Sequence, residues 1–131
     1  MCIVAGLAAA ILARAVLGLA GRAPVRAVIV LAGPLVEETA KTGLALAAGA
    51  DIMLTHAVFG GVELALEYRG GRGLAPGLAA VALHSLLGFI TARVTLAAGA
   101  PLPAVALAAA MHSLWNYAAV RLLGPDKRAG R

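Results

Sequence analysis

Charged residues are scarce in this chain. Lysine, arginine, aspartate and glutamate together make up 13% of its 131 residues, whereas 62% are hydrophobic. A soluble domain of this size usually carries about 25% charged residues. The composition therefore disfavours a soluble domain, and this includes a soluble helical bundle rich in alanine. It predicts an all-α integral membrane protein.

Cysteine is nearly absent as well. Cys2 is the single cysteine, so an internal disulfide is excluded. The sequence also lacks an internal repeat, a low-complexity tract and a long linker. These absences indicate one domain over residues 1–131.

The sequence contains five hydrophobic runs, which are separated by breaks rich in glycine and proline. They cover about 3–20, 27–49, 52–68, 77–99 and 104–123. Because a spanning helix needs about 17–25 residues, we expect a polytopic bundle of about five transmembrane helices. The alanine and glycine in these runs favour close helix packing. A cleavable signal peptide is disfavoured for the first run, because it lacks a basic start and is interrupted by Arg14.

Most basic residues follow alternate runs. They are Arg22, Arg26, Arg69, Arg72, Arg121, Lys127, Arg128 and Arg131. The intervening turns, at Asp51 and at 99–103, hold no lysine or arginine. Because short loops rich in Lys and Arg stay cytoplasmic, we expect an outside N-terminus and a cytoplasmic C-terminus in the plasma membrane. The basic residues are thus interpreted as topology signals, with the lipid bilayer as partner and no nucleic acid.

Several polar side chains interrupt the runs without a topological reason. They are Glu37, Glu38, Lys41, His56, Glu63, Glu67, His84, His112 and Asn116. At about 1.5 Å per residue, most of them lie roughly 8–16 Å from the cytoplasmic ends of their helices. Such groups usually face a bundle interior and often serve function. We expect all except His56 and Glu67 to form one site. His56 is predicted at the outer interface, and Glu67 is predicted to pair with Arg69 or Arg72 or to face solvent.

The second run carries the most polar part of this layer. Glu37 and Lys41 are four residues apart and so share a helix face. The adjacent Glu37 and Glu38 diverge by about 100° on a helix, so the two carboxylates need not face one cavity. Pro34 precedes them by one turn and removes a backbone hydrogen bond, which predicts a kink beside the site.

Four short motifs in this order resemble those of a known family. They are EETAK at 37–41, FGGVE at 59–63, HSLLG at 84–88 and HSLWN at 112–116. The set resembles the PrsW family of intramembrane proteases, whose pattern is EExxK, FxxxE, a His followed by small residues, and HxxxN. The related CAAX prenyl proteases and bacteriocin-processing proteins carry EExxxR and FxxxH instead. Lys41 and Glu63 therefore favour the PrsW branch, with a motif core at 34–118.

The resemblance implies a multi-pass endopeptidase of the cell membrane. Its substrate would be a membrane-embedded protein or peptide, such as an anti-sigma factor, cleaved in or near its membrane segment. In the CAAX relatives, the first Glu of the pair and the residue at the FxxxH histidine hold the attacking water, which points to Glu37 and Glu63 here.

The chemistry of the residues agrees with hydrolysis. Glu37 or Glu38 could act as the base that activates water. Lys41, Glu63 and His84 would orient that water. His112 and Asn116, one turn apart, would stabilise the oxyanion.

The need for a metal is left open by these residues. One alternative is a metal-free glutamate mechanism. The other is a zinc site made by Glu63, His84 and His112 with one open position. Because the sequence has no HExxH, such ligands would come from separate helices. A proton-coupled transporter is a further alternative, since buried Glu and His side chains also relay protons. The inverted repeat that would favour transport is not visible in the sequence. An inactive membrane scaffold is the other alternative.

Overall fold

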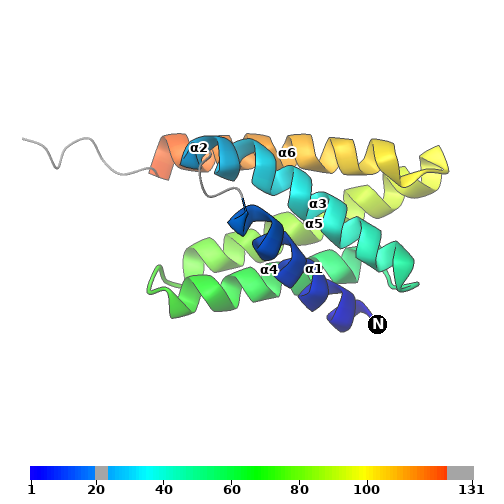
Figure 1. The fold of residues 1–131 in the computed structure, drawn as a ribbon, viewed down its shortest axis with the longest axis horizontal. Coiled ribbons are helices and arrows are strands. Elements are labelled where there is room, and N and C mark those ends of the chain that lie inside the picture. Colours follow the sequence, from blue (N-terminus) through cyan, green and yellow to red (C-terminus); the bar gives the residue numbers. More distant parts are fainter. Residues whose placement is uncertain (20–23, 124–131) are drawn as a thin grey trace, which may run out of the picture.

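A computed structural model describes residues 1–19 and 24–123, and this part of the chain is entirely helical apart from its turns (Figure 1). The elements are α1 (Cys2–Gly18), α2 (Val25–Ala27), the π-helical η1 (Val28–Ala32), α3 (Gly33–Ala47), α4 (Ile52–Arg69), α5 (Leu74–Ala98) and α6 (Pro101–Leu123). Because α2, η1 and α3 are continuous, they form one rod. The predicted all-α fold with five helices is confirmed. Four basic residues of the topology prediction, Arg22, Lys127, Arg128 and Arg131, lie outside the described residues.

Short turns join neighbouring helices into antiparallel pairs. Asp51 begins α4, where its carboxylate accepts a hydrogen bond from the backbone N–H of Leu54 at 2.7 Å, so it acts as an N-cap. The α5–α6 turn contains Gly99 with φ of 66°, a left-handed conformation that glycine adopts without strain. In Figure 1, α4 and α5 run alongside each other, and α6 lies along the α2–η1–α3 rod.

Glycines bring α4 and α5 into backbone contact. A Cβ added at Gly60 would lie 2.9 Å from Cα of Val81, and one at Gly88 would lie 3.0 Å from Cα of Met53. No side chain fits in these spaces, so the small residues set the separation of the two helices. This is the packing that the alanine and glycine content predicted.

Burial of side chains is inverted relative to a soluble protein. The buried polar side chains are Glu38, Lys41, Thr42, Thr55, His56, His84, Thr91 and His112. Nine of the eleven buried hydrophobic residues are alanine, the others being Phe59 and Leu87. Large apolar side chains face outward on every helix, for example Ile11, Leu35, Leu54, Phe89 and Leu114. The interior of the bundle is therefore small-residue and polar, and its surface is apolar.

One described helix, α5, is long and apolar enough to cross a membrane when judged by length and composition alone. The helix α1 is apolar but shorter. Charged side chains interrupt the apolar sequence of α3 at Glu37, Glu38 and Lys41, and that of α4 at Glu63, Glu67 and Arg69. Length and composition therefore support a membrane span for α5 alone among the described helices, and not for each of the five expected ones.

The rod changes its helical winding just before Pro34, where the sequence predicted a kink. The backbone N–H of Gly33 donates to the carbonyl of Val28, five residues back, as in a π-helix. Pro34 follows as the next residue and has no N–H to donate. A π-helical turn therefore precedes the two glutamates, and such turns are frequent at functional sites.

Candidate functional site

A chain of hydrogen bonds crosses the interior and joins four helices. Glu63 on α4 lies 2.6 Å from Nε2 of His84 on α5, and Nδ1 of His84 lies 2.8 Å from Nζ of Lys41 on α3. Lys41 donates to Oε1 of Glu38 at 2.6 Å, and Nδ1 of His112 on α6 lies 2.9 Å from the same oxygen. These five side chains, placed together by the sequence, do lie together.

The partners of His84 determine its protonation pattern. An ammonium group only donates hydrogen bonds, so Nδ1 of His84 accepts from Lys41. Nε2 then carries the hydrogen and donates to Glu63. Both ring nitrogens of His84 are thus engaged, and the imidazole acts as a link between Lys41 and Glu63.

Glu38 lies at the centre of the polar interior and is fully buried. Besides Lys41 and His112, it faces His56, whose Nδ1 lies 3.5 Å from Oε2 of Glu38. Thr42 Oγ1 lies 3.3 Å from Nε2 of the same histidine. The predicted interfacial position of His56 is therefore wrong, because this side chain is 0% exposed and belongs to the cluster. The signal for this was its spacing: His56 precedes Phe59 by three residues and Glu63 by seven, which places the three on one helix face.

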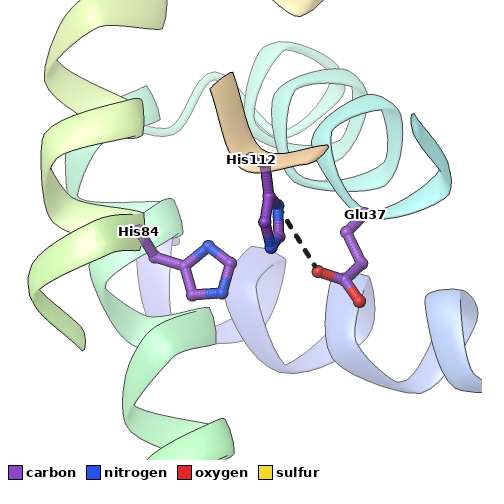
Figure 2. Close-up of side chains that lie close together, drawn as sticks. All are labelled: Glu37, His84 and His112. Atoms are coloured by element: carbon purple, nitrogen blue, oxygen red, sulfur yellow. Dashed lines mark ion pairs between the residues drawn. The ribbon is translucent and has the colours of Figure 1, made fainter. Parts of the chain in front are cut away.

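Glu37 lies at the edge of this network and makes no side-chain hydrogen bond within it. Its Oε2 is buried and has no hydrogen-bond partner among the described residues, and it lies 3.9 Å from Nδ1 of His112. Figure 2 shows Glu37, His84 and His112 pointing toward one another from α3, α5 and α6. The two adjacent glutamates therefore have different surroundings, as the helical divergence allowed. Both have a buried Oε2 without a hydrogen-bond partner among the described residues, but Glu37 lines two cavities and Glu38 lines neither of them.

Two cavities meet at Glu37 and Glu63. The smaller, about 180 Å³, is also lined by His84, His112 and Asn116. The larger, about 370 Å³, lies between α1 and α4 and also touches Phe59 on the α4 side. A carboxylate pair shared by both cavities could contact a substrate and a water molecule at the same time.

Other polar side chains around the site are placed as follows. Glu67 pairs with Arg72, one of the two partners predicted for it. Arg14, on α1, lines the larger cavity, a position the sequence did not indicate. Asn116 lines the smaller cavity, but its Nδ2 donates to the backbone carbonyl of Ile29 at 2.9 Å. The amide expected to bind an oxyanion thus has a backbone partner on the π-helical turn.

The ligand atoms closest together are not those of the predicted zinc site. Glu37, His84 and His112 each offer an atom within 4.8 Å of the others, whereas the prediction named Glu63 in place of Glu37. Ligation by His84 requires a free ring nitrogen, and both are engaged. Releasing Nδ1 would put the metal next to the Lys41 ammonium, and releasing Nε2 would break the contact with Glu63. Glu37, His84 and His112 are therefore a possible metal-binding triad, in which His84 would have to give up one of its two hydrogen bonds.

No family model, curated protein or solved structure matches this chain. The relation to the PrsW family therefore stays a prediction that rests on the four motifs.

Proposed function

We propose that this protein is an intramembrane endopeptidase in which Glu37 activates water to hydrolyse a peptide bond. The observation that carries the proposal is the unpaired, buried Oε2 of Glu37 at the junction of two cavities. A general base needs a free lone pair within reach of the proton that it removes. Glu38 also has an unpaired Oε2, but it is less suited to this role because it lines neither cavity and its Oε1 is engaged by Lys41 and His112.

The inverted burial supports a membrane location for the whole bundle. Lys41 and Glu38 are fully enclosed while leucines and isoleucines cover the outside. In water this arrangement would leave the apolar surface without compensation, whereas in a bilayer it is the expected one. A polytopic bundle remains consistent with helices of 15 to 25 residues.

The described basic residues support the predicted orientation. Arg26, Arg69, Arg72 and Arg121 belong to α2, to the α4–α5 turn and to the end of α6. Figure 1 shows these segments at one end of the bundle, opposite the α3–α4 and α5–α6 turns. Under the positive-inside rule that end is cytoplasmic, which puts the N-terminus outside.

The proposed reaction uses two carboxylates and one water. Glu63, held by His84, and Glu37 both line the cavities and can each accept one hydrogen of the water. Glu37 takes a proton as the water oxygen bonds to the peptide carbonyl carbon. It returns that proton to the leaving amine nitrogen when the C–N bond breaks, so that a carboxylic acid and an amine are released.

The developing oxyanion needs a positive or donor group. His112 is held through Nδ1 by Glu38, which leaves Nε2 without a partner among the described residues. When both ring nitrogens carry hydrogen, Nδ1–H is held by Glu38 and Nε2–H can be donated to the oxyanion. Lys41 adds positive charge through Glu38 and balances the carboxylates nearby. Each member of the hydrogen-bond chain therefore has a role in the reaction.

The larger cavity suits an extended peptide segment. On the α1 side it is lined by the small side chains of Ala10 and Ala13, and on the α4 side by Phe59 and Val62. A substrate segment between α1 and α4 would present its backbone to Glu37 and Glu63. The proposed substrate is accordingly a membrane-embedded protein or peptide.

A proton-coupled transporter is the second candidate. The observation that favours it is the unbroken chain from Glu63 through His84, Lys41 and Glu38 to His112, since such chains relay protons in transporters. The unpaired carboxylate of Glu37 favours hydrolysis over this candidate, because a relay alone does not need it.

The test compares cells that produce the wild type, Glu37→Gln or Glu67→Gln at matched levels. The control is chosen because Glu67 lines the same cavities but is paired with Arg72. New protein N-termini in the membrane fraction are mapped by mass spectrometry. We expect new termini near the ends of membrane segments with the wild type and with Glu67→Gln, and none with Glu37→Gln. Identical termini in all three strains, together with proton flux into vesicles that Glu38→Gln abolishes, would favour the transporter instead.

A further inference from the structure

The backbone carbonyl of Ile29 is left without a donor inside its own helix. In an α-helix it would accept from Gly33, but the N–H of Gly33 donates to Val28 instead. In the π-helical pattern it would accept from residue 34, which is proline and has no N–H. Ile29 lies at the surface of the bundle, and an unpaired carbonyl there is costly when lipid surrounds it, because lipid offers no hydrogen-bond donor.

Asn116 supplies the missing hydrogen bond. Its Nδ2 donates to the Ile29 carbonyl at 2.9 Å, which joins the middle of α6 to η1. The residue is therefore required by a defect that Pro34 and the π-helical turn create together. The two halves of this contact are 87 residues apart in the sequence.

The π-helical turn lies directly beside the proposed catalytic carboxylate. A Cβ added at Gly33 would be 3.1 Å from the carbonyl of Val28 and 3.8 Å from Oε1 of Glu37. Movement of this turn would therefore move the first turn of α3 and the side chain of Glu37. The geometry points to Asn116 as a positioning residue that satisfies the Ile29 carbonyl and thereby holds Glu37 at the cavities. Its importance for catalysis rests on the proposed function.

A double-mutant cycle between Asn116→Ala and Pro34→Ala tests the contact. Pro34→Ala restores an N–H at position 34, so the Ile29 carbonyl regains a backbone donor in either an α- or a π-helical pattern. Amide hydrogen exchange of residues 28–33 is measured in the purified full chain. We expect Asn116→Ala to speed exchange about fivefold to tenfold in the wild-type background, the loss of one hydrogen bond, and by less than about twofold with Pro34→Ala.

Two control variants make the cycle specific. Asn116→Asp keeps the shape of the side chain but replaces the donor with an oxygen, so it should speed exchange at least as much as Asn116→Ala. Ser113→Ala, on the same helix, should have the same small effect in both backgrounds. An equal effect of Asn116→Ala in both backgrounds would overturn the inference.

The positioning of Glu37 is measured by the rate at which an apolar carbodiimide labels this carboxyl, with Glu67 as internal reference. We expect Asn116→Ala to change the labelling rate of Glu37 severalfold, leave that of Glu67 unchanged, and be reversed by Pro34→Ala. An unchanged rate at Glu37 in the Asn116→Ala variant would refute the positioning role. Because labelling needs no substrate, this result is independent of whether the chain proves to be a protease.

Discussion

The buried ion pair between Lys41 and Glu38 makes the sharpest prediction about stability. Lys41 Nζ lies 2.6 Å from Glu38 and 2.8 Å from His84, and both charged side chains are 0% exposed. Lys41→Met keeps the length of the side chain but removes the charge, which leaves the Glu38 carboxylate buried without its cation. Removing one partner of a buried pair costs about 3–5 kcal/mol, so we expect a loss of that size in the free energy of unfolding.

The second half of this prediction concerns the double variant Glu38→Gln, Lys41→Met. Replacing both partners of a buried pair removes the unpaired charge and is often close to neutral. Because His112 also loses its carboxylate partner, we expect a loss of about 1–2 kcal/mol rather than none. The double variant should therefore be more stable than Lys41→Met alone.

Unfolding of the purified chain in mixed micelles, followed by circular dichroism, gives the required free energies. Arg72→Met is the matched control, because it breaks the pair with Glu67, in which the arginine side chain is 68% exposed, and should cost at most about 1 kcal/mol. Equal losses for Lys41→Met and the double variant, or a loss of under about 1 kcal/mol for Lys41→Met, would refute the reasoning about a buried, uncompensated charge.

Two further predictions concern packing and metal binding. Gly60→Ala should destabilise the chain by about 1–3 kcal/mol because its Cβ would lie 2.9 Å from the backbone of α5; Gly61→Ala, with nothing within 4 Å, should be neutral or stabilising by up to about 1 kcal/mol. The same unfolding assay measures both, and a similar loss for the two alanines would contradict the close helix contact. Zinc titration by calorimetry should show no binding tighter than about 1 μM to the wild type, because both nitrogens of His84 are engaged; a tighter site that Glu37→Gln removes would contradict this.

Much of the architecture follows from local sequence. Low charge, five apolar runs and glycine- or proline-rich breaks were sufficient to predict five helices. The observed ends differ from the predicted ones by at most three residues, for example Leu74 against 77. Local hydrophobicity and turn residues determine where helices begin and end. The depth of the polar side chains along their helices correctly brought Glu37, Glu38, Lys41, Glu63, His84 and His112 into one layer.

The partner of each side chain was decided by tertiary structure. The sequence did not assign the adjacent glutamates different surroundings, with Glu38 enclosed by Lys41 and His112 and Glu37 open to the cavities. Nor did it bring His56 into the cluster, because depth along one helix says nothing of how that helix is rotated against the next. Close contact of Gly88 with His56 fixes that rotation.

Asn116 shows the same division between sequence and structure. The spacing HxxxN places Asn116 one helical turn after His112, which predicts that the two side chains lie on the same face of the helix. Its hydrogen bond to Ile29 depends on a π-helical turn, a missing N–H at Pro34 and the approach of two helices far apart in the chain. Sequence periodicity thus determined which residues could meet in the interior. Only the packing of the helices, through their rotation and the change of winding before Pro34, decided which atoms pair and which carboxylate lines the cavities.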